Sequence, residues 1–339
     1  MRWVVAQPGP SFSVQDVHVG WVEALRAAGQ EVHEFNLDDR LTVFGAALKQ
    51  VGSETFTRMF SAEQAYALAA DGLNSMLYKA WPDVLLVVSG FFIPPDILEK
   101  ARRTRTRVVL LHTEAPYEND RMMQLAPYAD LLMVDDPTDM GMFQPAVRTV
   151  YMPKAYRPSV HNPGPSVPEL ECDLAFVGTG YPSRVRFLEQ MDLSGLDVLL
   201  AGNWTGMTVE SPLYPFLAHD VDQCLDNARA VDVYRSMRVG LNLYRREAER
   251  GEVGGWSMGP RELEMAACGA FFLREPRGEG DEVLDMLPTF TSPGEASELL
   301  RYYLDRPDER QALADKARAA VADRTFDSNV ASLLRALGA

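Results

Sequence analysis

The residues with the clearest chemical potential lie between positions 259 and 264. Gly259 and Pro260 predict that a helix begins at Pro260, because proline is tolerated at the first helical position and glycine permits close approach of a ligand. Arg261 and Glu264 stand three residues apart, so both can point from one helix face into one pocket. A guanidinium at a helix N-terminus suits a diphosphate, and a carboxylate suits the hydroxyls of a ribose. The alternative is a surface Arg–Glu pair on an amphipathic helix.

A second candidate loop consists of Gly178, Thr179 and Gly180. It follows the apolar run LAFV and leads into a helix that carries Arg184. Small residues let backbone N–H groups approach an anion, so we predict a phosphate-binding loop, with a plain tight turn as the alternative. Ser183 stands where the dinucleotide fingerprint G-x-G-x-x-G has its third glycine, which disfavours an NAD-dependent dehydrogenase.

Candidate acids and bases occur nearer the N-terminus. His112 and Glu114 follow the apolar run VVLL, and a His and a Glu two apart at the end of a strand can both face a cleft. We predict His112 as the base for an acceptor hydroxyl, with Glu114 and Asp120 as weaker candidates. Asp16 is a further candidate base. The alternatives are a capping role for the 112–121 loop and, for Asp16, a carboxylate in the first turn of a helix over 17–28.

The elements that must position these residues alternate between strand and helix. Residues 2–6 predict a strand, 17–28 a helix and 30–35 a second strand, which together form one β-α-β unit. The pattern continues along the whole chain, with a helix at 231–237 and a strand at 240–243 in its second half. Continuous apolar strands indicate parallel sheets covered on both faces. The fold class is therefore α/β, with two Rossmann-like domains whose parallel sheets face a central cleft.

The domain boundary is expected in the proline-rich segment 157–170, RPSVHNPGPSVPEL. We predict a first domain over 1–155, a linker over 156–170 and a second domain over 171–325. A last helix over 326–339 is expected to pack back on the first domain. A chain of 339 residues suits two such domains.

Composition limits the function classes. The net charge of −15 argues against a general polyanion-binding surface. Three scattered cysteines exclude a disulfide framework and a cysteine-cluster zinc site. No uncharged stretch approaches the roughly 20 residues that a membrane helix needs, and no secretory leader is recognisable, so a cytoplasmic protein is expected.

Two further features concern possible partners. Five cations between Lys100 and Arg107 could contact a phosphorylated or nucleic-acid acceptor, although such a run is more often the solvated end of a helix. The five histidines show no metal-ligand spacing, so no protein-bound metal is expected.

Several of these motifs carry a resemblance. The run EMAACGA, starting at Glu264, resembles the Glu-x-x-x-Cys-Gly donor-site signature of GT-B glycosyltransferases. Together with LAFVGT and the spacing Arg261-x-x-Glu264, it is similar to the CgeB-like group. The similarity covers most of residues 172–325. It implies a second domain that binds a nucleotide-diphosphate-sugar, with a UDP-sugar favoured, and an acceptor on the first domain.

The resemblance implies a metal-independent transferase. Arg184, Arg261 and the helix start at Pro260 would bind the diphosphate, Glu264 the ribose, and His112 or Asp16 the acceptor hydroxyl. The acceptor would be a cell-surface glycan or a hydroxymethylated base in DNA. The pattern departs from the family at Trp256, where an acidic residue is usual. A nucleotide-sugar epimerase and a catalytically silent sugar-nucleotide or glycan-binding protein remain as alternatives.

Overall fold

The computed structural model describes residues 1–7, 12–50, 62–221, 223–225, 227–248, 251–252 and 254–338. The chain divides into two compact units. Unit 1 comprises Met1–Pro153 and Phe326–Ala339, and unit 2 comprises Lys154–Thr325. Each unit is described by itself below.

Unit 1 is built on a six-stranded parallel sheet in the order β2-β1-β3-β4-β5-β6. Apolar residues dominate the central strands, and β3 and β5 are buried along their whole length. The strands are β1 (Arg2–Gln7), β2 (Glu31–Asn36), β3 (Val84–Val88), β4 (Arg107–His112), β5 (Leu131–Val134) and β6 (Thr149–Tyr151).

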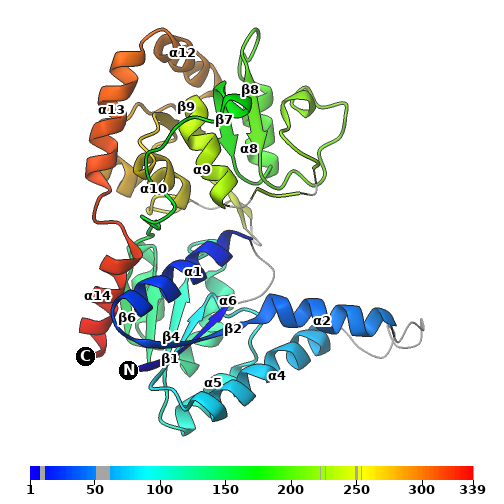
Figure 1. Ribbon diagram of the computed structural model, residues 1–339, viewed down its shortest axis with the longest axis vertical. Coiled ribbons are helices and arrows are strands. Elements are labelled where there is room, and N and C mark those ends of the chain that lie inside the picture. The colour runs from blue at the N-terminus through cyan, green and yellow to red at the C-terminus, as the bar shows by residue number, and fades with distance from the viewer. Residues whose placement is uncertain are drawn as a thin grey trace. The chain divides into compact units, whose positions relative to one another are not determined.

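Helices cover both faces of this sheet (Figure 1). They are α1 (Phe12–Ala27), α2 (Leu37–Gln50), α4 (Ala62–Ala80), α5 (Pro95–Arg103), α6 (Asn119–Leu125), α7 (Met140–Phe143) and the C-terminal α14 (Phe326–Leu337). The last of these packs beside α1, where Trp21 and Phe326 meet edge to face at 6.2 Å. The guanidinium of Arg107 donates to the Leu337 carbonyl at 2.7 Å, and that of Arg148 donates to the Ala336 carbonyl at 2.9 Å. Cations therefore satisfy two of the terminal carbonyls of α14.

Unit 2 is built on a four-stranded parallel sheet in the order β12-β9-β7-β8, with a short antiparallel pair outside it. The strands of the sheet are β7 (Cys172–Val177), β8 (Val198–Ala201), β9 (Met237–Asn242) and β12 (Phe272–Arg274), and the pair is β10 (Glu247–Ala248) with β11 (Gly251–Glu252). The helices are α8 (Pro182–Glu189), α9 (Asn227–Ser236), α10 (Pro260–Ala267), α11 (Gly278–Val283), α12 (Pro293–Leu304) and α13 (Pro307–Ala320).

The two sheets share one topology. In unit 1 the chain passes from β1 outward to β2 and then returns to the other side of β1 with β3. In unit 2 it passes from β7 outward to β8 and returns to the other side of β7 with β9. Each sheet therefore has a switch point, between β1 and β3 and between β7 and β9, beyond which ligands bind in open α/β sheets. The predicted α/β class with two parallel sheets is confirmed.

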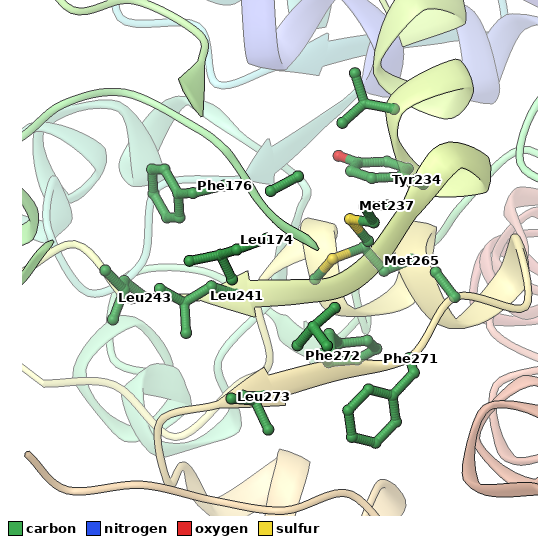
Figure 2. Close-up of a cluster of buried hydrophobic side chains, with 14 of the residues drawn as sticks. Leu174, Phe176, Tyr234, Met237, Leu241, Leu243, Met265, Phe271, Phe272 and Leu273 are labelled. Carbon is green, nitrogen blue, oxygen red and sulfur yellow. The ribbon is translucent and has the colours of Figure 1, made fainter. Parts of the chain in front are cut away.

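A close contact at Gly240 fixes α10 on the sheet of unit 2. A Cβ at this position would lie 2.6 Å from Met237 Cε and 2.8 Å from Met265 Sδ. Figure 2 shows these two methionines between Tyr234 and the strands. The missing side chain of Gly240 thus lets α10 approach β9 closely, and α10 carries Arg261 and Glu264.

Some predicted boundaries were wrong. α1 begins at Phe12, not at residue 17, so Asp16 lies beyond its first turn. α9 ends at Ser236 and β9 begins immediately afterwards, three residues before the expected strand. No turn residue separates α9 from β9, and the first residues of β9, Met237 and Arg238, suit a helix as well as a strand. Composition alone therefore does not show where the helix ends and the strand begins.

The proline-rich segment 156–170 is fastened to unit 2. The Arg235 guanidinium donates to the Asn162 carbonyl at 2.9 Å and to its side-chain oxygen at 2.8 Å. The Val167 N–H donates to Ser236 Oγ at 2.9 Å. These bonds join the segment to α9, so it is part of the folded unit and not a free connection.

Within the described residues, no helix has the length and apolar character needed to cross a membrane. Cys172 and Cys268 are buried and Cys224 is half-buried, all as free thiols. Burial raises the pKa of Cys172 and of Cys268 to about 12, so both stay protonated at neutral pH.

We expect the substitution Gly240→Ala to destabilise the protein by about 1–3 kcal/mol, because the new methyl group overpacks Met237 and Met265. Urea unfolding measures the change. Gly294→Ala on α12 is the matched control, since nothing lies within 4 Å of a Cβ there. Equal stability of the two variants would contradict the packing role of Gly240.

Candidate functional site

Both candidate segments of unit 2 leave strands that flank its switch point. The Gly178–Thr179–Gly180 loop follows β7 and leads to α8, which carries Arg184. The segment that ends in Gly259 follows β9 and leads to α10. Because neighbouring parallel strands end at the same edge of a sheet, the fold brings these two segments together.

Side chains join the two segments directly. The Ser183 N–H and hydroxyl donate to the Glu247 carboxylate at 2.8 and 3.1 Å. The guanidinium carbons of Arg184 and Arg245 lie 5.2 and 5.0 Å from the centroid of the Tyr181 ring. Two cations, one from each segment, therefore gather at one aromatic ring.

The glycines of the first loop serve packing. The Gly178 N–H donates to the Ala201 carbonyl at 2.8 Å, and the Gly180 N–H donates to the Asn203 carbonyl at 2.8 Å. A Cβ at Gly180 would lie 2.3 Å from the ring of Trp204. These contacts account for both glycines as parts of a tight turn against the loop after β8. Both amides therefore donate to backbone carbonyls in this structure, and phosphate binding by this loop stays a prediction.

The N-terminus of α8 already holds an anion, the carboxylate of Glu247. Partial burial raises the pKa of Glu247, but the hydrogen bonds from Ser183 outweigh it and leave the pKa below its ordinary value. Glu247 therefore stays ionised and complements the helix dipole. Arg184 bends back within the loop, where its Nη1 donates to the Thr179 carbonyl at 3.0 Å.

The second segment begins a helix where the sequence predicted. α10 starts at Pro260 with Gly259 as its N-cap residue. The Gly259 N–H donates to Glu262 Oε2 at 2.7 Å, and the Tyr244 hydroxyl donates to the same oxygen. Glu262 therefore closes the first turn of α10 as the acidic residue of a capping box does. The sequence analysis missed it, although its place three residues after Gly259 was a signal.

Arg261 and Glu264 form an ion pair with each other, as in the alternative left open by the sequence, but Glu264 is buried and not on the surface. Arg261 Nη1 lies 2.7 Å from Glu264 Oε2, and the buried Tyr234 hydroxyl donates to the same oxygen at 3.1 Å. Glu264 is 5% exposed. Burial raises its pKa, but the charge of Arg261 and these hydrogen bonds outweigh burial and hold the pKa below its usual range. Glu264 is therefore a buried, ionised carboxylate.

A histidine that the sequence analysis did not select lies beside this carboxylate. A ring nitrogen of His161 is within 4.8 Å of a Glu264 carboxylate oxygen. His161 Nδ1 accepts the Arg157 N–H at 3.3 Å, and His161 Nε2 has no hydrogen-bond partner among the described residues. Its place in a proline-rich stretch gave no sign that it reaches α10.

The loop before α10 is held by α11. Buried Glu279 accepts the Met258 N–H at 2.8 Å and pairs with Arg324 at 2.8 Å. Trp256 packs on the start of α11, where a Cβ on Gly278 would lie 2.1 Å from Trp256 Cδ1. At the position where the family resemblance would have an acid, this chain thus has a packing residue.

Unit 1 places its candidate residues differently from expectation. His112 ends β4 and is 0% exposed, and its Nε2 lies 2.8 Å from Asn119 Oδ1. Phe91 and Phe143 meet its ring edge to face at 6.1 and 5.8 Å. The ring is thus enclosed by aromatic side chains and tied to the loop that follows β4, and a role of His112 as acceptor base stays a prediction. β4 is a central strand, and its last side chain turns into the core.

The other three candidate bases of unit 1 are more accessible, and Asp120 is exposed in the first turn of α6. Glu114 is half-buried in the loop after β4, where its carbonyl accepts the Glu118 N–H at 3.0 Å. Asp16 is half-buried on α1. Residues 8–10, which precede α1 in the sequence, lie outside the described residues.

The cations between Lys100 and Arg107 lie at the opposite edge of the sheet, because Arg107 begins β4. Most of them have protein partners. Lys100 pairs with Asp96 at 2.7 Å, Arg102 with Asp130 at 3.1 Å, and Arg103 with Glu99 at 2.7 Å. This arrangement is that of the solvated end of a helix.

The comparison with family models finds a match over residues 184–335 to a family described as "Glycosyl transferase-like". The matched part contains α10 with Arg261 and Glu264. No match was found among the curated proteins.

Solved structures match along nearly the whole chain. An OtsA apo structure has a TM-score of 0.62 at 15% identity and covers 99% of both chains. The N-terminal domain of Candida albicans trehalose-6-phosphate phosphatase has a TM-score of 0.63 at 10% identity, covering 99% of this chain and 96% of the other. An α,α-trehalose-phosphate synthase (UDP-forming) from Burkholderia vietnamiensis has a TM-score of 0.60 at 12% identity, covering 99% and 98%. These likenesses show the fold, which is GT-B. Together with the family match they support a glycosyltransferase.

The raised pKa of Glu262 implies that the stability of the folded protein depends on pH. Complete burial raises this pKa from 4.5 to about 7. The folded state therefore retains a proton that the unfolded chain loses, and stability falls as pH rises from about 4.5 to about 7. Such a shift corresponds to about 3 kcal/mol.

We expect Glu262→Gln to remove this loss, because glutamine keeps the cap but does not ionise. Urea unfolding of wild type and variant is compared at about pH 5 and about pH 8, with exposed Glu298→Gln as the matched control. The free energy of unfolding of Glu262→Gln, relative to that of wild type, should increase from the lower to the higher pH. The same change in unfolding free energy with pH for wild type and Glu262→Gln would contradict the buried, protonated state of Glu262.

Proposed function

We propose that this chain is a GT-B glycosyltransferase of CgeB-like type that moves a sugar from a nucleotide-diphosphate-sugar, with a UDP-sugar favoured, to an acceptor hydroxyl. The observation that carries this proposal is Glu264, an ionised carboxylate buried at the start of α10 and paired with Arg261 beside the switch point of unit 2. The family match covers the same helix. The UDP-forming trehalose-phosphate synthase from Burkholderia vietnamiensis has the same fold, which supports a UDP-sugar as donor.

In this proposal α10 receives the nucleotide. Glu264 accepts hydrogen bonds from the ribose hydroxyls in place of its present donors. Arg261, whose side chain is 29% exposed, moves from Glu264 to the diphosphate. Arg184 and Arg245, already gathered at Tyr181, add positive charge as the nucleotide diphosphate departs. Fixed cations and a helix N-terminus stabilise a leaving diphosphate electrostatically, a task that needs no bound metal.

The acceptor oxygen attacks the anomeric carbon, the bond from that carbon to the diphosphate breaks, and the acceptor proton passes to a base. Asp16 and Glu114 are the proposed bases of unit 1, since both are partly exposed whereas His112 is enclosed. The acceptor is proposed to carry a free hydroxyl, as a glycan or a hydroxymethylated base does.

The first test is a thermal-shift and nucleotide-release panel with UDP-, GDP-, TDP- and ADP-sugars, with and without EDTA. We expect a shift with one donor and slow, EDTA-insensitive hydrolysis, because water replaces the absent acceptor. Conversion of the sugar would instead identify an epimerase, and a shift without turnover would identify a silent binder. The absence of any shift would overturn donor binding.

We expect Glu264→Gln and Arg261→Gln each to weaken donor binding by about tenfold or more, because each removes a charged hydrogen-bonding partner. Calorimetric titration with the donor found in the panel measures this. Exposed Glu298→Gln is the control and should bind as wild type does. Intact binding with a lowered melting temperature in the Glu264 and Arg261 variants would mean that the pair is only structural.

We expect Asp16→Asn or Glu114→Gln to lower the transfer rate by about 10²-fold or more while donor binding is kept, since general-base catalysis has this size. Glu23→Gln, exposed on α1, is the matched control. Single-turnover transfer at saturating donor gives the rate. Unchanged transfer in both variants would remove these residues as acceptor bases.

A further inference from the structure

Unit 1 contains an aromatic hollow of about 560 Å³, a size typical of small-molecule sites. Tyr66, Phe91 and Phe92 contribute rings to its wall, and Ile93, Pro94, Pro95 and Leu125 add further apolar surface. The polar groups on the wall come mainly from Arg121 and Gln124, and Arg121 is the one charged side chain among the described residues that line it.

The position of this hollow in the sheet favours a ligand site. The loop that carries Phe91 and Phe92 follows β3, and β3 flanks the switch point of unit 1. In sheets of this strand order, ligands bind beyond the carboxyl ends of the strands at that point. The hollow therefore lies at the edge of the sheet where the fold class places substrates.

The backbone that presents the two phenylalanines is under constraint. Ser89 and Gly90 have φ of 59° and 81°, and positive φ is uncommon for serine. Ser89 is held in this conformation by its N–H, which donates to the Leu111 carbonyl at 2.8 Å, and by its hydroxyl, which lies 2.5 Å from Thr113 Oγ1. The sharp turn after β3 is thus tied to the loop after β4, which carries Glu114.

Three aromatic rings of the wall lie beside a cation. Tyr66 and Phe92 have ring centroids 4.7 Å apart at an interplanar angle of 30°. The guanidinium carbon of Arg121 lies 4.4 Å from the centroid of Phe91 and 5.3 Å from that of Phe92. The Arg121 guanidinium donates to the Phe91 carbonyl at 3.4 Å and lies 3.6 Å from the Glu118 carboxylate. Its side chain is 37% exposed, so part of the guanidinium remains accessible to a ligand anion.

This chemistry favours an aromatic ligand over a sugar. A pyranose that enters a pocket buries several hydroxyls, and each requires a hydrogen-bond partner. The wall offers few such partners and several rings. A planar aromatic ring stacks on such a wall, and an attached acid group pairs with the guanidinium.

We propose that this hollow binds a planar hydroxylated aromatic acid, whose hydroxyl is the acceptor in the proposed transfer. This inference rests on the proposed function for the reaction, whereas the binding itself does not depend on it. Phe91 also packs against His112, which lies two residues before Glu114, the proposed base, in the chain.

The test is calorimetric titration of the full-length protein, without donor, with para-hydroxycinnamate. The comparison ligands are its methyl ester, which lacks the charge, and methyl glucoside, which lacks the ring. We expect the acid to bind about tenfold more tightly than the ester, because only the acid pairs with Arg121. No binding of methyl glucoside is expected.

Substitutions of residues that line the hollow test whether the ligand binds there. Phe92→Ala and Arg121→Gln should each weaken binding of the acid by about tenfold, and Arg121→Gln should leave the ester unaffected. The matched controls are Tyr78→Ala on α4, a residue 62% exposed, and Arg103→Gln on α5, with a side chain 73% exposed. Both should bind as wild type does, and melting curves check that each variant folds.

Three outcomes would overturn the proposal: no binding of the acid, preferred binding of methyl glucoside, or binding of the acid that the hollow variants leave unchanged. Donor binding is measured on the same preparations. Specific binding of the acid with no donor binding would support the hollow as a binding site for the acid and would contradict the proposed sugar transfer. Donor binding without acid binding would leave the transfer standing and overturn the hollow.

Discussion

The physical constraint on which unit 2 depends is the placement of two buried carboxylates within one turn of α10. Glu262 and Glu264 are both almost inaccessible to water, yet their surroundings differ. Glu262 receives neutral donors, the Gly259 amide and the Tyr244 hydroxyl, so burial prevails and its pKa rises to about 7. Glu264 receives the guanidinium of Arg261, so its pKa falls. One carboxylate can therefore cap the helix while the other keeps a charge available for a ligand.

Close backbone approach is what keeps these groups in place. Gly240 allows α10 to press on β9, and Gly180 allows the loop after β7 to lie against Trp204. The loop before α10 is held from the other side by α11 through Glu279. The Arg261–Glu264 pair therefore lies on a helix that is packed against the sheet, and not on a free loop. Such support is what a site for a charged nucleotide needs, since a poorly fixed cation stabilises a departing diphosphate less well.

Unit 1 uses the same topology for different chemistry. At its switch point the turn at Ser89 and Gly90 presents aromatic rings, where unit 2 presents ion pairs and helix N-termini. The one charged side chain of the hollow stacks on those rings. A strand order that is repeated in both units thus carries a charged site in one and an apolar site in the other. This division fits a reaction that joins a charged donor to an acceptor of lower charge.

The sequence by itself determined the α/β class, the start of α10 at Pro260 and the position of Arg261 and Glu264 on one face of that helix. These features are local: proline fixes a helix start, and residues three apart on a helix are neighbours wherever the helix lies. The sequence did not determine which glycines approach a neighbouring loop, because that depends on Trp204 and Met265, which are distant along the chain.

Only the tertiary structure decided that His112 is enclosed by Phe91 and Phe143, that His161 reaches Glu264, and that aromatic rings from α4 and the loop after β3 line one hollow. The sequence pattern placed His112 at the end of a strand, but not on which side of the sheet its ring would pack. How far a side chain is exposed depends on neighbours that come from several elements of the fold. The spacing of residues within one helix or strand therefore predicts the position of a side chain on that element, but not which residues surround it.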